Sequence, residues 1–364
     1  MARIITITSG KGGVGKTSIS LNVSLALASK GFKVCLFDAD LGLANVNILT
    51  GIYPEKDLES VIEGQADLTD IIIKSYQGID IIPGSSGVEK IADLTRTQTD
   101  NLISAFLDLE DYDYFIFDTS AGISAQVLSF CMASNEIILV ATCEPTSLTD
   151  AYSLLKVLSK YQYDRPVKVV INQVRSGKAA QKAYVQLKET VNRFLLIKVE
   201  PLGIMASDKN VRASVISQTP FFMLFPDTIA SKCINAIARK LIATPGQTGQ
   251  MPMELFWDQC LAFLEKHHAP QKKTVPSKAA TPQKAIKKDE TENNPDISNA
   301  LFRIEDKLSL LIKEVREIKQ VLNPNTPVPE KNNEKTPVLP KPKALTLDFE
   351  SWLKKRKISQ SPCL

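Results

Sequence analysis

The 364-residue sequence has few cysteines, and none of them is spaced to hold a metal cluster. Its six cysteines are scattered, mostly inside apolar segments, and no two form a C-x-x-C pair. Proteins that assemble iron–sulfur clusters need such closely spaced thiolates, so the sequence excludes that chemistry. Isolated cysteines in apolar surroundings are typical of reduced, buried thiols; the six are Cys35, Cys131, Cys143, Cys233, Cys260 and Cys363.

Long hydrophobic runs are also missing. No apolar run reaches the roughly 18 residues that a membrane-spanning helix requires. The N-terminus enters a strand-like segment without the charged-then-apolar pattern of a secretory leader. The sequence therefore predicts a cytoplasmic protein.

Neither sign of charge dominates most of the chain. Residues 1–268 carry 25 Lys and Arg against 28 Asp and Glu, whereas residues 269–364 carry 19 against 12. A slightly acidic body argues against a core built to coat nucleic acid, so we expect no sequence-specific nucleic-acid binding. Eleven of the 20 prolines lie in residues 269–364, and this composition predicts that the segment is mostly linker.

The first 245 residues contain an alternation of short apolar strands and helical patterns. This alternation predicts an α/β fold, a doubly wound and mostly parallel sheet with helices on both sides. Several strand candidates are apolar nearly throughout, as strands buried on both faces are. In such a sheet the ligand binds at the carboxyl ends of the strands. The candidates are Ile4–Thr8, Val34–Phe37, Ile79–Ile82, Tyr114–Phe117, Ile137–Ala141, Val167–Ile171 and, more weakly, Leu202–Met205.

A phosphate-binding loop follows the first strand candidate. In "SGKGGVGKTS" (residues 9–18), Gly10, Gly15, Lys16 and Thr17 fit the pattern G-x-x-x-x-G-K-[ST] between a strand and a helix. Glycines let the backbone N–H groups converge on a phosphate, and the N-terminus of the following helix adds its dipole. Lys16 would bridge the β- and γ-phosphates, and the Thr17 hydroxyl would occupy one magnesium position.

Three carboxylates follow later strand candidates. Asp118 ends "YFIF" and is placed as the acidic residue that holds magnesium through water in P-loop ATPases; its alternative role is a helix N-cap. Asp38 and Asp40 stand two residues apart after the second strand. We assign Asp40 to positioning the attacking water and Asp38 to the metal shell, although the opposite allocation is open.

The loop also carries a second lysine, Lys11, one residue past Gly10. A cation there can stabilise the negative charge that builds up during hydrolysis, as an arginine finger does. Its side chain cannot easily fold back onto its own nucleotide in a tightly wrapped loop, so a neighbouring subunit's nucleotide is its natural target. This predicts a dimer with two nucleotides at its interface. The alternative is a solvated loop charge.

Taken together, "KGGVGKT", "DADLGLAN", "DTSAG" and "EPTSLTDAY" resemble the MinD/ParA family of deviant-Walker ATPases. Over roughly residues 1–245 the motifs are most similar to the FlhG branch (also called FleN or YlxH), the regulators of flagellar number and placement. The resemblance implies a homodimer that forms with ATP and Mg²⁺ and hydrolyses ATP slowly under partner stimulation. FlhG proteins often carry an N-terminal extension with a short motif that stimulates the GTPase FlhF. Strand one here begins at Arg3, so the resemblance does not extend to that partnership.

The resemblance also assigns roles to single residues. Lys11 matches the signature lysine that contacts the partner subunit's nucleotide, and Asp150 matches its acidic partner in the monomer. Glu144 and Asp150, both in "EPTSLTDAY", belong to the switch and dimer region. Asn172 matches the adenine-reading asparagine, and Asp208 lies in the loop that closes over the base. The phosphate loop corresponds to Gly12, Gly13, Val14, Gly15, Lys16, Thr17 and Ser18.

Beyond residue 245 the sequence predicts four further segments. An amphipathic helix at 251–268, with its apolar face within 253–266, is either a membrane-targeting helix or one docked on the core or a dimer partner. A linker at 269–296 precedes a heptad pattern at 297–322 that predicts a short coiled coil. The 323–364 tail is Pro-rich and ends in a basic amphipathic peptide, "LTLDFESWLKKRK", suited to a partner's groove, an acidic membrane surface or solvent.

The sequence thus predicts an ATP-dependent switch that dimerises, binds flagellar regulators or basal-body proteins, and contacts the inner membrane face reversibly. Other cargoes, such as a chromosome, a chemoreceptor array or a pilus, are alternatives within the same class. A different class is a non-enzymatic, ATP-locked scaffold or transcription-factor antagonist.

Overall fold

The computed structural model describes residues 1–40, 45–54, 56–84, 94–107, 109, 112–244 and 249–267. Within them an eight-stranded sheet forms in the order β3-β4-β2-β5-β1-β6-β7-β8. The described neighbours run parallel except β3, which pairs antiparallel with β4 at one edge. The strands are β1 (Arg3–Ser9), β2 (Val34–Ala39), β3 (Ile73–Tyr76), β4 (Ile79–Ile82), β5 (Tyr114–Ala121), β6 (Glu136–Thr142), β7 (Val167–Val174) and β8 (Val199–Ala206).

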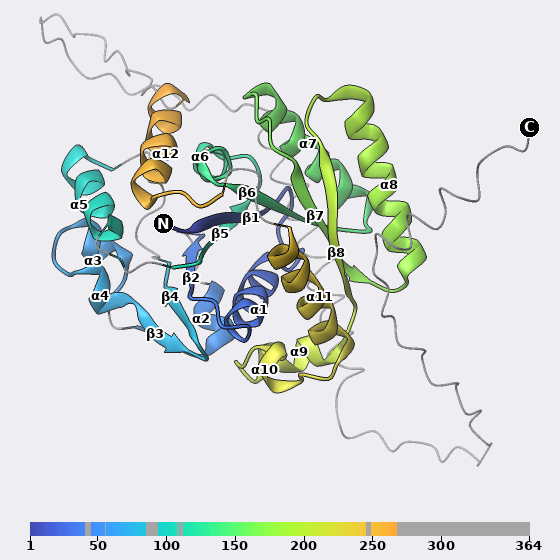
Figure 1. Cartoon of the computed structure of the whole chain (residues 1–364), viewed down its shortest axis with the longest axis horizontal. Helices are drawn as coiled ribbons and strands as arrows, with labels where there is room; N and C mark the ends of the chain where they lie inside the picture. The colour runs from blue at the N-terminus through green and yellow to red at the C-terminus, as the bar shows by residue number, and fades with distance from the viewer. Residues whose placement is uncertain are drawn as a thin grey trace, which may run out of the picture. The chain divides into compact units, whose positions relative to one another are not determined.

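This architecture confirms the predicted doubly wound, mostly parallel α/β sheet (Figure 1). All seven strand candidates form strands, and β3 is an addition that the sequence analysis missed. The helices are α1 (Lys16–Ala28), α2 (Asn45–Thr50), α3 (Leu58–Ile62), α4 (Leu68–Ile71), α5 (Arg96–Leu107), α6 (Ala125–Ala133), α7 (Pro145–Lys160), α8 (Gly177–Phe194), α9 (Lys209–Ile216), α10 (Phe221–Leu224), α11 (Ile229–Ala243) and α12 (Met253–His267).

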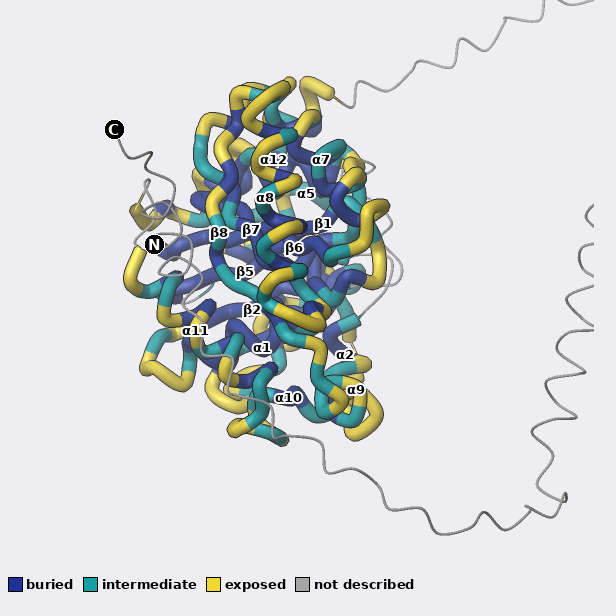
Figure 2. Tube along the Cα trace, turned by 90° about the vertical axis from the view of Figure 1, so that its right-hand side faces the viewer, coloured by how far each residue is buried: buried dark blue, intermediate teal, exposed yellow. Residues whose placement is uncertain are grey.

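The two faces of the sheet carry separate hydrophobic layers. Successive side chains of a strand point to opposite faces, and in β1 Ile4 joins the cluster formed with α5, α6 and α12, whereas Ile5 joins the cluster formed with α1 and α11. A third cluster packs α7 and α8 on β6 and β7. The central strands are therefore buried, and most exposed residues lie on the outer helices and at the sheet edges (Figure 2).

Helix α12 packs on the core, so its apolar face is not free. Phe256, Trp257, Cys260 and Leu264 are buried, and the Trp257 ring lies 5.0 Å from that of Phe106 in α5. The Cys260 Sγ also lies 3.1 Å from the hydroxyl of Ser129 in α6. Of the two alternatives for 253–266, the structure adopts the docked helix. The folded body therefore extends past residue 245 to at least residue 267.

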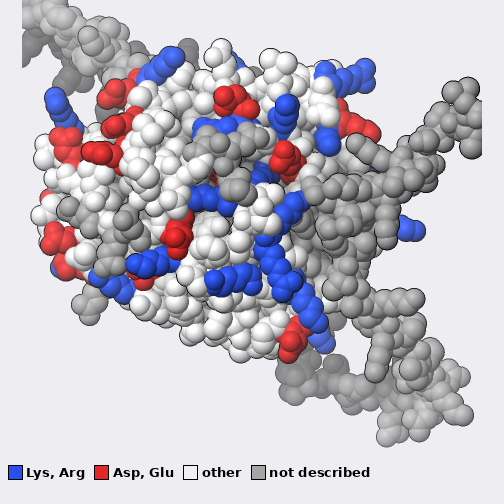
Figure 3. Space-filling model, in the orientation of Figure 1, with Lys and Arg blue, Asp and Glu red and all other residues white. Residues whose placement is uncertain are grey.

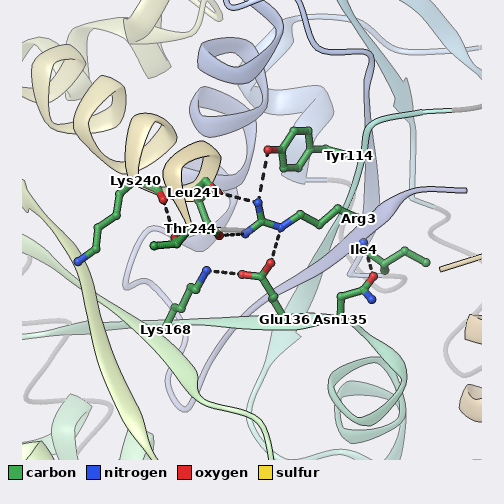
Figure 4. Close-up of polar contacts among 9 residues, drawn as sticks. All are labelled: Arg3, Ile4, Tyr114, Asn135, Glu136, Lys168, Lys240, Leu241 and Thr244. Carbon is green, nitrogen blue, oxygen red and sulfur yellow. Dashed lines mark hydrogen bonds and ion pairs between the residues drawn. The ribbon is translucent and has the colours of Figure 1, made fainter. Parts of the chain in front are cut away.

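A buried cluster of charges connects the amino ends of strands β1 and β6 to helix α11 (Figure 4). Arg3 at the start of β1 pairs with Glu136 at the start of β6, and Lys168 of β7 approaches Glu136 from its other side at 2.5 Å. The Arg3 guanidinium also donates to two backbone oxygens at the C-terminal end of α11, those of Leu241 at 2.6 Å and Thr244 at 2.8 Å. Cations are favourable at that end of a helix.

The structure describes five of the cysteines, and all five are free thiols. Three of them are buried: Cys35, Cys131 and Cys260. No helix within the described residues is long and apolar enough to span a membrane. Cys363, the 269–296 linker, the predicted coiled coil at 297–322 and the 323–364 tail lie outside the described residues.

Candidate functional site

The phosphate-binding loop connects β1 to α1 at the carboxyl end of the sheet. Gly13 and Gly15 have left-handed φ values of 76° and 89°, which glycine adopts without a steric cost. No side chain caps the N-terminus of α1. Its first backbone N–H groups are therefore available to bind an anion. A Cβ on Gly10 would lie 2.2 Å from the backbone of Asp150, so α7 approaches the loop too closely for any larger residue.

Two side chains from the end of β7 hold the loop in place. The Asn172 side-chain amide donates to the Val14 backbone oxygen at 2.6 Å, and a Cβ on Gly15 would lie 2.4 Å from its Nδ2 atom. Gln173, with φ 55°, donates to the Gly13 oxygen at 3.3 Å. Asn172, which the sequence predicts to read adenine, therefore lies against the phosphate loop, and its side-chain amide holds the loop backbone at Val14. Its contact with a base stays a prediction.

Asp38 and Asp118 lie side by side because β2 and β5 are paired in register at these two residues. Burial raises the pKa of Asp118 to about 6, against the opposing effects of the Lys16 ammonium and of hydrogen bonds from Thr17 and Ser20. The Ser20 hydroxyl donates to Asp118 Oδ1 at 2.8 Å. Burial, followed by repulsion from Asp118, also raises the pKa of Asp38.

Asp38 and Asp40 both accept hydrogen bonds from the first residues of α2. Asp38 Oδ2 accepts from the Val46 backbone N–H at 3.0 Å, and the half-buried Asp40 accepts from the Asn45 side chain at 3.0 Å. Burial raises the pKa of Asp40, whereas Lys16 and Asn45 lower it. The observed bonds of Asp38 go to backbone amides, so any part it plays in the metal shell stays a prediction.

Lys11 has a different acidic partner from the expected Asp150. Its ammonium lies 3.1 Å from the Glu144 carboxylate and 3.2 Å from the Thr146 hydroxyl, at the N-terminus of α7. Asp150 instead contributes its backbone to the packing against Gly10. The Lys11–Glu144 ion pair is solvent-exposed, with 40% and 64% of the two side chains accessible. The ammonium therefore lies at the open surface of the site.

The structure places Asp208 at the N-cap of α9. Its carboxylate accepts from the backbone N–H of Asn210 at 2.9 Å and from that of Ala230 at 3.3 Å. This is the ordinary turn chemistry of aspartate, and a contact with a nucleotide base stays a prediction. Sequence reasoning missed Ser20, Thr146 and Gln173 as site residues. Ser20 had a signal, because it lies one helical turn after Lys16 and shares its face.

The side chains present fit magnesium bound with a nucleotide. Asp118 Oδ2 is buried without a hydrogen-bond partner in the described part of the chain, as suits an oxygen that faces a metal-bound water. The described residues hold no cluster of three or more His, Cys, Asp or Glu that would bind a metal alone. Magnesium typically binds one or two protein groups together with phosphate oxygens and water. Thr17 and Asp118 would be those groups.

Strand, glycine loop, helix N-terminus and buried carboxylate together define a P-loop nucleotide-binding protein. The family model described as "AAA domain" matches residues 2–171. Antiactivator FleN of Pseudomonas aeruginosa is 39% identical over 244 residues, covering 67% of this chain and 87% of FleN. Flagellum site-determining protein YlxH of Helicobacter pylori is 33% identical over 246 residues, covering 66% and 82%.

A solved structure gives the same family. The septum site-determining protein MinD from Pyrococcus horikoshii, complexed with Mg-ADP, aligns with a TM-score of 0.53 and 27% identity, covering 66% of this chain and 96% of that one. The chain belongs to the MinD/ParA family of P-loop ATPases, with FlhG-type proteins (FleN and YlxH) among its relatives. Members of this family bind ATP with Mg²⁺ and hydrolyse it.

Proposed function

We propose that this protein is a switch ATPase that dimerises when it binds ATP and controls flagellar number or placement. The observation that carries the proposal is the position of Lys11. Its ammonium lies next to the phosphate loop but is held outward by Glu144 and Thr146 at an exposed edge. From there it can reach a nucleotide in a second copy that faces this one.

Each residue of the site has a part in this reaction. Lys16 and the loop amides would bind the β- and γ-phosphates, and Thr17 with Asp118 would hold magnesium. When bound, magnesium supplies charge neutralisation at the phosphates. Asp40, fixed by Asn45, orients the attacking water, and Lys11 of the opposing subunit stabilises the charge that develops. Hydrolysis in this proposal is slow and stimulated by a partner protein.

The site is connected to a partner surface through α2. Asn45 and Val46 at its N-terminus bond directly to Asp40 and Asp38, so a change in the shell of these carboxylates moves α2. The turn that follows α2 contacts the turn that follows α9 through a hydrogen bond from the Gln218 side chain to the Tyr53 hydroxyl at 3.3 Å. Exposed large apolar side chains gather on α2, α9, α10 and the turn after α2: Ile48, Tyr53, Val215, Ile216, Met223 and Leu224. This surface would bind flagellar regulators or basal-body proteins.

The flagellar role is supported by the names of two relatives, an antiactivator and a flagellum site-determining protein. Positioning of another cargo by the same switch is the alternative. We also propose a cytoplasmic location with reversible contact at the inner membrane face, possible through 253–266 only if α12 leaves the core, where Phe256 and Trp257 are now buried.

The dimer is tested by measuring the mass of the full chain by light scattering, with Mg²⁺ and a non-hydrolysable ATP analogue. Wild type should double in mass, and Lys11→Ala should stay monomeric while still binding nucleotide. Lys178→Ala, which removes an exposed lysine of α8, is the matched control and should dimerise. A Lys11→Ala protein that dimerises as wild type does would refute the role of Lys11.

A second experiment separates the enzyme from the scaffold. Asp40→Ala should bind ATP and dimerise but not hydrolyse it. If cells carrying Asp40→Ala keep a normal number and placement of flagella, turnover is incidental and the ATP-locked antagonist is the better description. Abnormal flagellation would support the cycling switch.

A further inference from the structure

A buried serine of α1 lies directly beside the carboxylate that we assign to magnesium. Ser20 follows Lys16 by one helical turn, and its hydroxyl lies 2.8 Å from Oδ1 of Asp118 in β5. Helix α1 packs on β5 through the apolar layer that contains Ile19 and Ile116. A hydroxyl buried in such a layer is costly unless it has a hydrogen-bond partner. The choice of that partner is therefore informative.

The neighbouring Ser24 shows what a buried serine of α1 does by itself. Its hydroxyl is as fully buried as that of Ser20, and it donates to the Ser20 backbone oxygen at 2.8 Å. This bond to the carbonyl four residues earlier is the usual way in which a helical serine satisfies its hydroxyl. Ser20 has the same local acceptor, the Lys16 backbone oxygen at 3.0 Å. Its contact with Asp118 is therefore additional to what the helix requires.

The hydroxyl of Ser20 has one proton for two acceptors. A hydrogen bond to an ionised carboxylate is shorter and stronger than one to a neutral carbonyl, and the distance to Asp118 Oδ1 is the shorter of the two. We therefore assign the proton to the bond with Asp118. The acidic side chains that Figure 3 shows lie at the surface, where water solvates them. Asp118 is fully buried, so its ionised form depends on donors from the protein.

This bond makes the two oxygens of Asp118 unequal. Oδ1 accepts from Ser20, whereas Oδ2 is buried without a hydrogen-bond partner among the residues that the structure describes. The terminal torsion of an aspartate is broad, so without an anchor the two oxygens could exchange places. Thr17 also donates to Asp118, but Thr17 is expected to bind magnesium itself. Ser20 is thus the donor that can hold the carboxylate without also serving as a metal ligand.

We propose that Ser20 is a positioning residue for magnesium. It anchors Asp118 through Oδ1 and so leaves Oδ2 to accept from a water on the metal. Partners that orient a metal-binding group in this way commonly contribute a large part of the metal affinity. The inference rests on the proposed magnesium site of Thr17 and Asp118. It is independent of dimerisation and of the flagellar role.

The affinity of the full chain for Mg²⁺ tests this role. Isothermal titration calorimetry of Mg²⁺ into the 1:1 complex with ADP gives the Mg²⁺ dissociation constant, and titration of ADP in EDTA reports on the phosphate loop alone. Ser20→Ala should weaken Mg²⁺ binding by about tenfold. Its dissociation constant for ADP in EDTA should stay as in wild type, because the loop residues are unchanged.

Ser24→Ala is the matched control, because it removes an equally buried hydroxyl of the same helix whose bond goes to the backbone. It should bind Mg²⁺ as wild type does. Ser20→Cys keeps the shape of the side chain with a weaker donor, and it should fall between wild type and Ser20→Ala; it replaces Ser20→Ala if that variant does not fold. In an Asp118→Ala background, Ser20→Ala should have no further effect on Mg²⁺, because Ser20 acts through Asp118.

Three results would overturn the proposal. Ser20→Ala could bind Mg²⁺ as tightly as wild type while Asp118→Ala does not, so that the magnesium site stands and Ser20 is only structural. Ser24→Ala could weaken Mg²⁺ binding as much as Ser20→Ala does, which would make the effect one of helix packing. Wild type could bind ADP without binding Mg²⁺, which would remove the magnesium site itself and this inference with it.

Discussion

The buried carboxylate Asp118 should destabilise the protein while nucleotide and magnesium are absent. The pKa of Asp118 is raised from 3.8 to about 6, so at pH 7.5 the folded state must hold an ionised group that it disfavours. At 1.36 kcal/mol per pH unit, a shift of about two units corresponds to about 3 kcal/mol. Asp118→Asn keeps the shape of the side chain and removes the charge. It also relieves the repulsion that Asp118 exerts on Asp38.

We expect Asp118→Asn to raise the free energy of unfolding at pH 7.5 by about 1–3 kcal/mol, because it removes a buried charge. The gain is smaller than the full value of about 3 kcal/mol where the amide loses the carboxylate's favourable contact with Lys16. In a domain of this size that corresponds to a melting temperature higher by about 2–4 °C per kcal/mol. The raised pKa means that folded wild-type protein binds the Asp118 proton more tightly than the unfolded chain does. The stability that protonated Asp118 gives to wild type is therefore full below about pH 4 and is lost as the pH rises through about 6.

The assay is urea unfolding of the full chain at pH 5 and pH 7.5, in EDTA without nucleotide. The advantage of Asp118→Asn should be smaller at pH 5 than at pH 7.5. Added Mg²⁺ and ADP should stabilise wild type more than the variant. Asp164→Asn, which changes a side chain that is 90% exposed, is the control and should have no effect. A variant less stable than wild type at pH 7.5 would refute the reasoning.

Three further predictions follow from the packing. Trp257→Ala should lower the free energy of unfolding by about 3–5 kcal/mol in urea, because it leaves a cavity between α12 and the sheet. Arg3→Met should cost about 3 kcal/mol in the same assay, since it leaves Glu136 buried with Lys168 as its remaining partner; an unchanged midpoint would contradict it. Gly10→Ala should abolish binding of fluorescent ADP analogues, because its Cβ would lie 2.2 Å from the backbone of α7; normal affinity would show that the loop can shift.

Much of the fold and the phosphate loop could be predicted because each rests on short-range pattern. Strands β1 and β6 are buried over their whole length and rich in β-branched and apolar residues, and the loop's glycines, lysine and threonine stand close together in the chain. Edge strand β3 escaped because it is four residues long, half exposed and contains Ser75 at φ 54°, so no alternation of polarity marks it.

The amino-acid sequence by itself determined that this chain builds a parallel sheet with a phosphate-binding loop and carboxylates at its carboxyl edge. Only the tertiary structure decided that Lys11 pairs with Glu144, 133 positions away, and not with Asp150. It also decided that α12 turns its apolar face to the core, since an amphipathic pattern specifies a face to bury and not what covers it. Which residues far apart in the sequence come into contact depends on how the strands and helices pack in three dimensions. No local sequence pattern specifies that packing.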